Sequence, residues 1–445
     1  MNERYLAAIE VSTSKIVAAI GKTRGAGTLD VVAVEYESTP EGCVRYGIIQ
    51  NLEETSTVVA RLFSRLEQRA NIHPRKIKSV IVGLGGRSLK NITKEVSMSL
   101  PEDTEITDDI LARLQDLALH SAIDNTLEVV DAVPRVFKVG NSSTSSPKGM
   151  VGNHISGVFD LIVCRPELKR NIRRTIVDKL HLEVDGFVVT ALATGHLILS
   201  PEEKRLGCML VDMGAETTTV TIYQKGSLTY FATIPMGGRN ISRDIASLGV
   251  VDAKAEEIKI TSANSLAESE VPNLNINNLK LSDISNLVVA RSEEIVANII
   301  AQIEYAGIKD SDLQGGIIGI GGGFRMKGFM ELLERESNIS VRRGSLPDYV
   351  RVEDTRANGI ESAEVVSVLY AGATLTDKES LFMPEKAPMP VNGVLQFPDE
   401  EEPEKKPQKH EEAPKPKNNI WKKLGKGIGG IFGGADEDES DLLDD

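Results

Sequence analysis

Two acidic residues, each at the end of a short apolar strand, are the chain's clearest candidates for chemistry. Glu10 precedes a turn of small and hydroxylated residues at 11–15, and Asp212 precedes a similar turn at 213–217. Such turns offer backbone N–H groups to an anion, and a carboxylate at a strand end can hold Mg²⁺ through water. A single segment of this kind is usually a plain β-hairpin. The duplication favours two hairpins that grip the phosphates of one nucleotide from both sides.

A glycine-rich segment supplies a third candidate site. The apolar run at 315–320 leads into Gly321, Gly322 and Gly323, and the pattern at 326–337 predicts a helix after them. Glycine lets the backbone approach a ligand closely, and the start of a helix favours phosphate or ribose. Glycines at such a corner are also common for packing reasons, so this motif is weak by itself.

Strand and helix signals that would position these candidates alternate from the N-terminus to about residue 377. This alternation predicts an α/β fold. The pattern at 241–306 is mostly helical, with a polar break at 273–278, and predicts an inserted subdomain. The other predicted elements are a helix at 55–71, a strand at 79–84, a strand at 92–99, a helix at 108–122 capped by Thr107, a loop at 141–153, a strand at 157–163, a helix at 166–180 and a strand at 184–189.

Composition limits the class of protein. With 445 residues the chain is long enough for two or more domains, and its net charge of −14 argues against nucleic acid as a partner. Cys43, Cys164 and Cys208 have no metal-ligand spacing, so we expect reduced, buried thiols in a cytoplasmic protein. We find neither a signal-peptide pattern nor an apolar run long enough to cross a bilayer.

Taken in chain order, the two hairpins and the glycine motif resemble the ATPase core shared by actin, heat-shock chaperones and sugar kinases. Within that superfamily the chain is most similar to the FtsA family of bacterial cell-division actin homologues. The closer match lies in the turns at 12–15 and 212–214, in the segment 255–259 and in the glycines 321–323. The segment 83–163 falls where that family carries its own extra subdomain. The resemblance covers residues 5–377 and extends to the tail.

This resemblance implies an actin-like ATPase fold, in which two duplicated α/β halves close around a nucleotide cleft. It implies ATP and Mg²⁺ as cofactors, with Glu10 and Asp212 holding the ion through water. The residues expected to contact the nucleotide are Glu10, Ser12, Thr13, Ser14, Lys15, Asp212, Gly214, Ala215, Thr217, Glu256, Lys259, Gly321, Gly322 and Gly323.

The domain organisation expected from the resemblance has two core subdomains and two insertions. The ranges are 1–82 for subdomain 1A, to which 163–185 and 365–377 return, 83–162 for the FtsA-type subdomain 1C, 186–240 and 307–364 for subdomain 2A, and 241–306 for the helical subdomain 2B. A linker at 378–417, an amphipathic helix at 418–433 and an acidic tail at 434–445 follow.

Several residues depart from the family's pattern, and we expect them to weaken catalysis. Glu10 stands where the family has an aspartate, and Ser12 where it has a glycine. Ala215 and Glu216 replace glycines of the second turn, so we expect crowding at the phosphates and repulsion by Glu216. Thr190 stands where related ATPases often place an acidic residue that orients water, and such a loss costs on the order of a hundredfold or more in rate. We expect at most a weak ATPase and assign no catalytic residue.

The C-terminal tail has the composition of a linker followed by a membrane anchor. Prolines and charged residues at 378–417 predict an extended, unfolded segment. In the next segment the apolar side chains share an arc of about 120°, and the lysines lie opposite, as in a helix at a membrane interface. The alternative is a helix that docks on the protein's own core or in a partner's groove. The residues expected at the membrane are Ile420, Trp421, Lys422, Lys423, Leu424, Lys426, Ile428, Ile431 and Phe432.

The resemblance implies a peripheral protein on the cytoplasmic face of the inner membrane at the division site. There it would polymerise, bind anionic lipid, tether FtsZ through that protein's C-terminal peptide, and help to recruit later division proteins. Arg291 matches a family arginine in the inserted helical subdomain and is the candidate for pairing with the acidic FtsZ peptide. The alternative for Arg291 is a surface ion pair with Glu294, three residues further on.

Two other functions within the same superfamily stay open at this point. A soluble sugar or acid kinase would need a catalytic base and a substrate pocket, and we identify neither in the sequence. A pilus-assembly ATPase would also carry the subdomain at 83–163, but the lysine-bearing terminal segment favours division.

Overall fold

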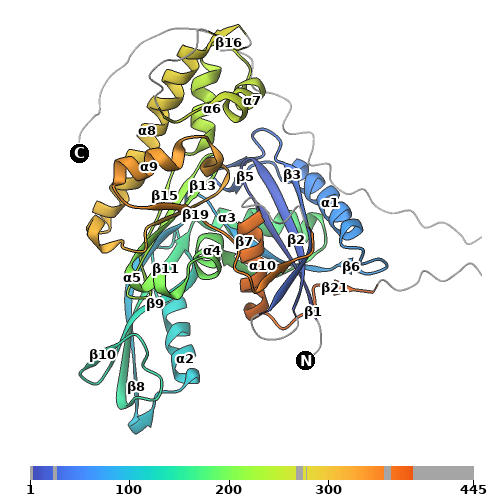
Figure 1. Cartoon of the computed structure of the whole chain (residues 1–445). Coiled ribbons are helices and arrows are strands. Elements are labelled where there is room, and N and C mark those ends of the chain that lie inside the picture. Colours follow the sequence, from blue (N-terminus) through green and yellow to red (C-terminus); the bar gives the residue numbers. More distant parts are fainter. Residues whose placement is uncertain (1–3, 24–27, 267–273, 277, 355–361, 384–445) are drawn as a thin grey trace, which may run out of the picture. The chain divides into compact units, whose positions relative to one another are not determined.

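The computed structural model describes residues 4–23, 28–266, 274–276, 278–354 and 362–383 (Figure 1). The predicted linker lies outside the described residues from residue 384 onward, and the predicted amphipathic helix at 418–433 and acidic tail at 434–445 lie outside them entirely. Within the described ranges, we find no helix long and apolar enough to cross a bilayer.

The first sheet has six strands in the order β12-β7-β1-β2-β3-β20. β2 pairs antiparallel with both β1 and β3, whereas β7 is parallel to β1 and to β12. All of β7 and most of β1 are buried, as expected for central strands covered on both faces. The strands are β1 Arg4–Val11, β2 Lys15–Thr23, β3 Leu29–Ser38, β7 Ser79–Leu84, β12 Glu183–Val189 and β20 Val350–Val352.

The second sheet repeats this topology with five strands in the order β15-β14-β13-β18-β19. β14 is antiparallel to β13 and β15, and β18 is parallel to β13 and β19. The repeated pattern confirms the duplicated halves that the resemblance implies. The strands are β13 Cys208–Met213, β14 Thr218–Gln224, β15 Ser227–Ile234, β18 Ile317–Ile320 and β19 Val341–Arg343.

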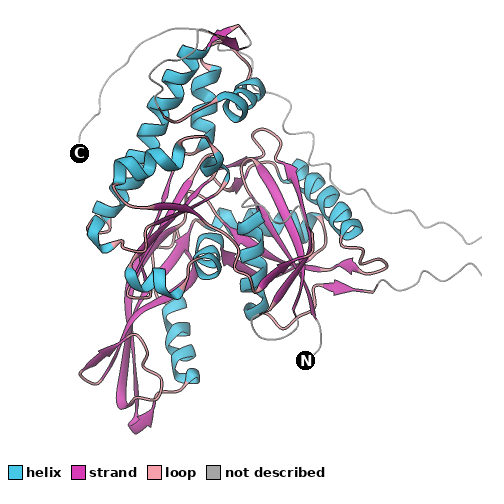
Figure 2. Cartoon of the chain, viewed as in Figure 1, coloured by secondary structure: helices cyan, strands magenta, loops and turns pink. Residues whose placement is uncertain are grey.

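Helices cover both faces of the first sheet (Figures 1 and 2). α1, Leu52–Arg69, packs on β2 and β3 beside η1, Arg174–Lys179, which continues α3, Pro166–Arg173. The Asn51 side chain accepts a hydrogen bond from Glu54 N and begins α1, whose apolar stripe faces the sheet. On the other face, α10, Ala363–Leu375, packs on β1, β2 and β7.

Two helices carry the chain between the halves and pack on each other. α4, Thr190–Ile198, follows β12 of the first sheet, contacts β14 of the second, and leads through α5, Pro201–Leu206, into β13. α10 brings the chain back from the second half to the first. The predicted boundaries change accordingly: β12 stays in the first sheet to Val189 rather than ending at 185, and β20, expected in subdomain 2A, pairs with β3. Strand pairing sets these subdomain boundaries, and it cannot be read from the amino-acid composition.

The segment between β7 and α3 forms a separate four-stranded sheet, order β10-β9-β11-β8, with its own apolar core under α2. Thr107 caps α2 as predicted. The predicted loop at 141–153 is wrong in part, because β10 occupies three of its residues and β11 begins at Val151. The elements are β8 Lys90–Glu105, α2 Asp108–Leu119, β9 Glu128–Val139, β10 Ser142–Thr144 and β11 Val151–Cys164.

The second half carries the predicted helical block. α6, Gly238–Ala246, packs on α7, Asp252–Ser262, and on the long α8, Leu281–Tyr305. The described part of the polar break contains the short strand β16 Asn275–Ile276, and β17 Leu279–Lys280 follows it. η2 Asp310–Asp312, η3 Gly322–Arg325 and α9 Phe329–Ser337 complete this half.

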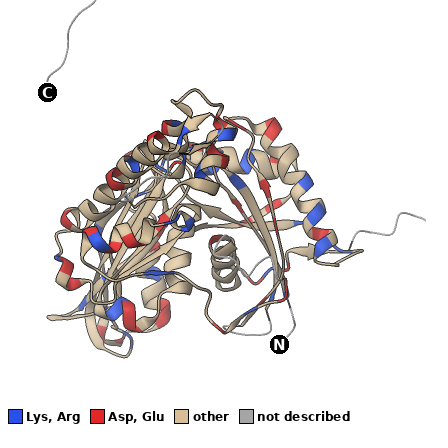
Figure 3. Cartoon of the chain, turned by 45° about the horizontal axis from the view of Figure 1, so that its top comes forward, with Lys and Arg blue, Asp and Glu red and all other residues tan. Residues whose placement is uncertain are grey.

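Acidic and basic residues are interspersed along the described helices and strands (Figure 3). Along α1, Arg61, Arg65 and Arg69 pair with Glu35 and Glu37 on β3. The three cysteines are free and buried, as predicted. The remaining short strands are β4 Val44–Arg45, β5 Ile48–Ile49, β6 Lys76–Ile77 and β21 Leu381–Phe382.

Candidate functional site

The two hairpins have the same register and the same turn. Glu10 lies opposite Val17 in the β1–β2 pair, and Asp212 lies opposite Thr219 in the β13–β14 pair, so each acidic residue faces the residue seven positions on. Ser12 N donates to Lys15 O at 3.0 Å, and Gly214 N donates to the carbonyl three residues on at 2.9 Å. Each turn therefore has fewer free N–H groups than predicted, because one N–H in each turn donates to a carbonyl of the same turn.

Three carboxylates from different elements come within electrostatic range of one another. They belong to Glu10 on β1, Asp212 on β13 and Glu364 on α10. Burial, Glu364 and Asp212 raise the pKa of Glu10 well above its usual value, although Lys15 opposes the shift. Burial and Glu364 raise the pKa of Asp212 to about 8. Burial also raises the pKa of Glu364, and the charge of Lys15 lowers it. The site therefore favours a cation or a proton.

Glu364 is a site residue that sequence reasoning missed. It begins α10, far along the chain from both hairpins, and only the return of this helix onto β1 brings it to the acidic cluster. A motif search would see an ordinary helix start with an acidic residue in its first turn.

Thr190 lies beside Glu10, at the start of α4. Its side chain is buried, and a hydrogen bond from its hydroxyl lowers the pKa of the Glu10 carboxyl. A Cβ added to Gly83 would lie 2.8 Å from this hydroxyl and 3.6 Å from the Glu10 Cβ. Thr190 therefore belongs to the acidic cluster.

The acidic residues fit a hydrated ion better than a directly ligated one. Among the described residues, no three His, Cys, Asp or Glu side chains are arranged to hold a metal ion directly. Glu10 and Asp212 stand at equivalent positions of the two halves, and hydrated Mg²⁺ is commonly held by one or two carboxylates together with phosphates. The residues therefore fit water-mediated Mg²⁺.

The glycine motif follows β18 and borders Asp212. Gly321 has a φ of 83°, and a Cβ there would lie 2.5 Å from Met213 O and 2.6 Å from Asp212 Oδ1. A Cβ on Gly323 would meet the Met213 side chain at 2.4 Å, whereas one on Gly322 would meet nothing within 4 Å. Two of the glycines are therefore required by close packing, and Gly322 borders open space.

Gly85 and Gly86, after β7, form a second glycine pair at the matching place in the first half, and sequence reasoning missed them. Glu10 pairs with Gly83 as Asp212 pairs with Ile320, so Gly85 after β7 corresponds to Gly322 after β18. A Cβ on Gly85 would have one neighbour within 4 Å, Glu10 Oε1 at 3.9 Å. Each glycine stands two residues beyond the residue that pairs with the acidic strand end, and only the strand pairing shows this, because the distances along the chain differ between the halves.

The second turn continues by hydrogen bonds into the helical block. Gly214 O accepts from Gly238 N at 3.0 Å, and Ala215 O accepts from the next N–H on α6. Lys259 Nζ on α7 donates to Gly238 O at 3.1 Å and pairs with Glu256 at 2.7 Å. The predicted adenosine-side residues Glu256 and Lys259 thus lie next to the start of α6, which touches the second hairpin.

The side chains of the first turn differ in burial. Thr13 is buried and Ser14 is exposed. Thr39 fixes the turn from β3's end: its Oγ1 donates to Ser12 O at 2.8 Å and its N donates to Ser14 O at 3.0 Å.

The expectation that Glu216 repels phosphate needs correction. Its carboxylate is buried and accepts hydrogen bonds from Tyr46 N at 3.0 Å and from Arg243 Nη2 at 3.0 Å. Arg239 Nη1 lies 3.4 Å away. Because two arginines pair with it, its charge is largely neutralised within the protein.

Arg291 on α8 is held by two acidic residues. Its Nε and Nη2 donate to Asp244 at 2.6 and 3.0 Å, and Nη1 pairs with Glu294. The ion pair with Glu294 is thus present, and Asp244 adds a bidentate contact absent from the prediction. The membrane residues at 420–432 lie outside the described residues, and nothing in the structure bears on them.

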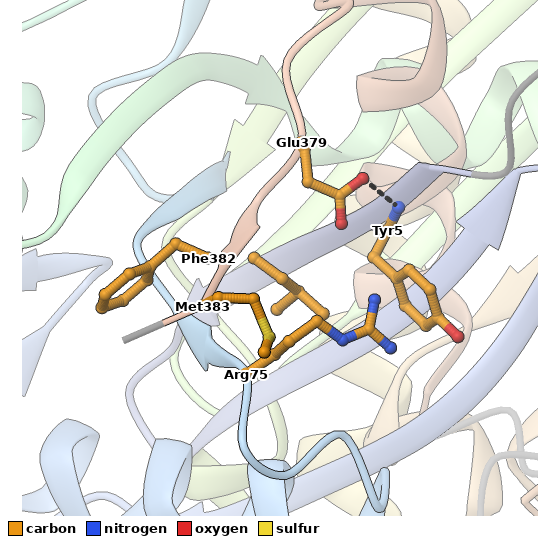
Figure 4. Close-up of a pocket in the computed structure, with 6 residues that line it drawn as sticks. Tyr5, Arg75, Glu379, Phe382 and Met383 are labelled. Atoms are coloured by element: carbon orange, nitrogen blue, oxygen red, sulfur yellow. Dashed lines mark hydrogen bonds between the residues drawn. The ribbon is translucent and has the colours of Figure 1, made fainter. Parts of the chain in front are cut away.

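A cavity of about 460 Å³ at the start of β1 is separate from this site (Figure 4). It is lined by Tyr5, Arg75, Glu379 and the β21 segment, with Glu379 accepting from Tyr5 N at 3.0 Å. Tyr5 and Glu10 stand at opposite ends of the same strand, so the cavity serves neither hairpin.

Two sheets of one topology, each with an acidic residue at the matching strand end, define this protein as a member of the actin-like class. The same fold occurs in a PilM–PilN type IV pilus biogenesis complex, which aligns with a TM-score of 0.58 and 14% identity over 82% of this chain and 98% of that one. At this identity the likeness concerns the fold alone.

Family models and relatives specify the class further. The model for cell division protein FtsA matches residues 209–374, and the model for the SHS2 domain inserted in FtsA matches residues 86–163. FtsA of Pseudomonas aeruginosa is 27% identical over 85% of this chain and 92% of its own length. FtsA of Bacillus subtilis is 28% identical over 79% of this chain and 81% of its own. With FtsA of Porphyromonas gingivalis the match, at 28% identity, spans 67% of this chain and 64% of the relative. The chain belongs to the FtsA family of cell division proteins.

Proposed function

We propose that the chain is an actin-like division scaffold that binds ATP, assembles into filaments on the cytoplasmic face of the inner membrane and tethers FtsZ there. The observation that carries this proposal is the pair of equivalent acidic hairpins in a chain that also has the FtsA-type inserted domain. The first feature supports a nucleotide site between two halves, and the second supports a role in division.

The nucleotide site is proposed to use both halves. Glu10 and Asp212 would hold Mg²⁺ through water, and this ion would neutralise phosphate charge. Lys15 lies within range of the same carboxylates and supplies a positive charge at the first turn. The open space beside Gly322 is proposed for adenosine, together with Glu256 and Lys259 of α7. No acidic residue takes the place of Thr190, so we expect slow or absent hydrolysis.

Membrane attachment is proposed to come from the tail. The apolar stripe that includes Trp421 would lie in the interface, with Lys422 and Lys423 on the anionic surface, each adding roughly 1 kcal/mol. Ordering a segment with several glycines offsets much of this gain. One copy therefore binds weakly, and a filament that presents many copies binds firmly by avidity. The acidic residues at 436–441 oppose the attachment.

FtsZ is proposed to dock on the helical block through its C-terminal peptide. Arg291 supplies a guanidinium that is still 27% exposed beside Asp244. Val251 and Ile260, at the start and along the side of α7, are each 73% exposed and offer apolar surface. An acidic peptide would share or replace the contacts that Arg291 makes with Asp244 and Glu294. Contacts with later division proteins are proposed from the family alone.

The experiment that tests this proposal is recruitment of FtsZ to anionic liposomes by the full chain. We expect FtsZ to pellet with the liposomes only when the chain is present. Arg291→Glu should weaken recruitment at least tenfold, whereas Arg335→Glu, at another exposed position that is 54% exposed, should not. Lipid-bound chain that leaves FtsZ in solution would contradict the tether.

The likeness to the pilus complex is a likeness of fold and supports no function in pilus assembly. A kinase function gains no support either, because Thr190 stands where an acidic catalytic residue would be expected.

A further inference from the structure

Glu216 is the side chain in the second hairpin that has no counterpart in the first. When the two turns are aligned, Glu216 takes the position of Ser14 in the first turn, and Ser14 is exposed and carries no charge. The Glu216 side chain is 1% exposed. A carboxylate buried to this degree needs hydrogen-bonded partners of opposite charge, or it is strongly unfavourable.

Its partners come from both halves of the protein. Tyr46, in the turn between β4 and β5 of the first half, donates its N–H to Glu216 Oε2 at 3.0 Å. Arg243 and Arg239 on α6 of the second half pair with Glu216 Oε1 at 3.0 and 3.4 Å. We call these three contacts the Glu216 link. Through it, the carboxylate joins a first-half backbone N–H to a second-half helix.

The first-half side of the link is rigidly fixed. A Cβ on Gly47 would lie 2.3 Å from Gly85 O, and one on Gly86 would lie 2.5 Å from Tyr46 O. Arg87 N donates to Tyr46 O at 3.1 Å, and the Arg87 guanidinium lies 5.5 Å from the Tyr46 ring. Backbone packing this close allows little movement of the turn, so Tyr46 moves with the glycines after β7.

Those glycines connect the link to the acidic cluster. A Cβ on Gly85 would lie 3.9 Å from Glu10 Oε1. On the other side, Glu216 belongs to the same turn as Gly214, two residues from Asp212. The link therefore spans the two halves close to the pair of carboxylates at which the proposed nucleotide would bind.

We propose that the Glu216 link is a positioning device that holds the two halves against each other without nucleotide. This inference rests on the proposed nucleotide site for its consequence, but the link itself is a contact within the protein. In a site that relied on the ligand to join its halves, phosphate would have to supply this contact. Here a buried carboxylate supplies it, so nucleotide binding changes the arrangement of the two halves little.

Hydrogen exchange of the nucleotide-free full chain tests the link directly. The Tyr46 amide should be protected in the natural protein and should exchange at least tenfold faster in Glu216→Ala. Glu202→Ala, at an exposed position 69% open to solvent, is the matched control and should leave that amide unchanged. Equal protection of Tyr46 in all three proteins would overturn the link.

A second pair of variants keeps the test valid if Glu216→Ala fails to fold. Glu216→Gln keeps an oxygen for the Tyr46 N–H but loses the charge, and Arg243→Ala removes the closer arginine. Both should raise exchange at Tyr46 by smaller factors than Glu216→Ala, with exchange in the inserted domain unchanged. Faster exchange spread evenly over all domains would mean general destabilisation and would contradict a local link.

Addition of Mg²⁺-ATP separates the link from the proposed function. Nucleotide should change Tyr46 exchange little in the natural protein and should restore protection in Glu216→Ala. If neither protein binds ATP in a direct titration, the nucleotide proposal fails while the nucleotide-free result still decides the link. Tighter ATP binding by Glu216→Ala, with Tyr46 protection unaltered, would show electrostatic repulsion and would refute the positioning role.

Discussion

At the glycine motif, the effect of a substitution on stability can be measured separately from its effect on ligand binding. Gly321 and Gly322 are adjacent, yet their surroundings differ. Alanine at Gly321 would place a Cβ 2.5 Å from Met213 O at a φ of 83°, whereas alanine at Gly322 would meet nothing within 4 Å. We therefore expect opposite outcomes from the same small substitution at neighbouring positions.

The magnitudes follow from these surroundings. A side chain in the left-handed region costs about 1–2 kcal/mol, and forcing a methyl group into packed backbone costs a further 1–3 kcal/mol or so. Gly321→Ala should thus lower the free energy of unfolding by about 2–5 kcal/mol. Gly322→Ala should change it by less than about 0.5 kcal/mol, as is usual for an exposed position.

The ligand assay uses Gly322→Leu, whose Cβ stands in open space. Urea unfolding should give a midpoint close to that of the natural protein. Binding of a fluorescent ATP analogue should weaken at least tenfold, which corresponds to about 1.4 kcal/mol. Unchanged nucleotide affinity in Gly322→Leu would refute the placement of adenosine beside this glycine. A large loss of stability in Gly322→Ala would refute the reasoning from open space.

Two further predictions concern buried charge. Asp160 has no exposed side-chain surface and accepts two hydrogen bonds from Arg135 at 2.9 Å, so Arg135→Met should cost about 3–5 kcal/mol in urea unfolding because it leaves a buried charge unpaired. Replacing Asp160 with Leu in the same protein should recover much of that loss, and no recovery would contradict the charge argument. The pKa of Asp212 is raised from 3.8 to about 8, so the folded nucleotide-free protein keeps a proton that the unfolded chain releases. Its stability should therefore fall as pH rises from about 4 to 8, and Asp212→Asn should flatten that dependence in thermal unfolding; equal slopes would count against it.

Local sequence was sufficient for the hairpins and for most helices. Glu10 and Asp212 end strands as predicted, because apolar runs followed by small-residue turns specify hairpins within a few residues. The duplicated topology followed from recognising that the two hairpins are alike. Asn51 caps α1, which therefore begins at Leu52, three residues before its predicted start.

The errors came from contacts between residues distant in sequence. Glu216 was expected to face phosphate. Its partner Tyr46 lies 170 residues away in the sequence, and no local sequence pattern indicates such a contact. Glu364 joined the site for a similar reason, since only the packing of α10 on β1 brings it there. β20 joined the first sheet by pairing with β3, so the boundary expected from the resemblance placed it in the wrong half.

The measurement that tests the central claim most directly is co-sedimentation with anionic liposomes. It compares the full chain, Trp421→Glu and a chain truncated after Pro416, each with and without ATP at low salt. A membrane-attached scaffold predicts that the full chain pellets with the liposomes and that both variants stay in solution. If all three proteins stay in solution, or if the truncated chain pellets as well as the full chain, the claim that the tail attaches this protein to the membrane is wrong.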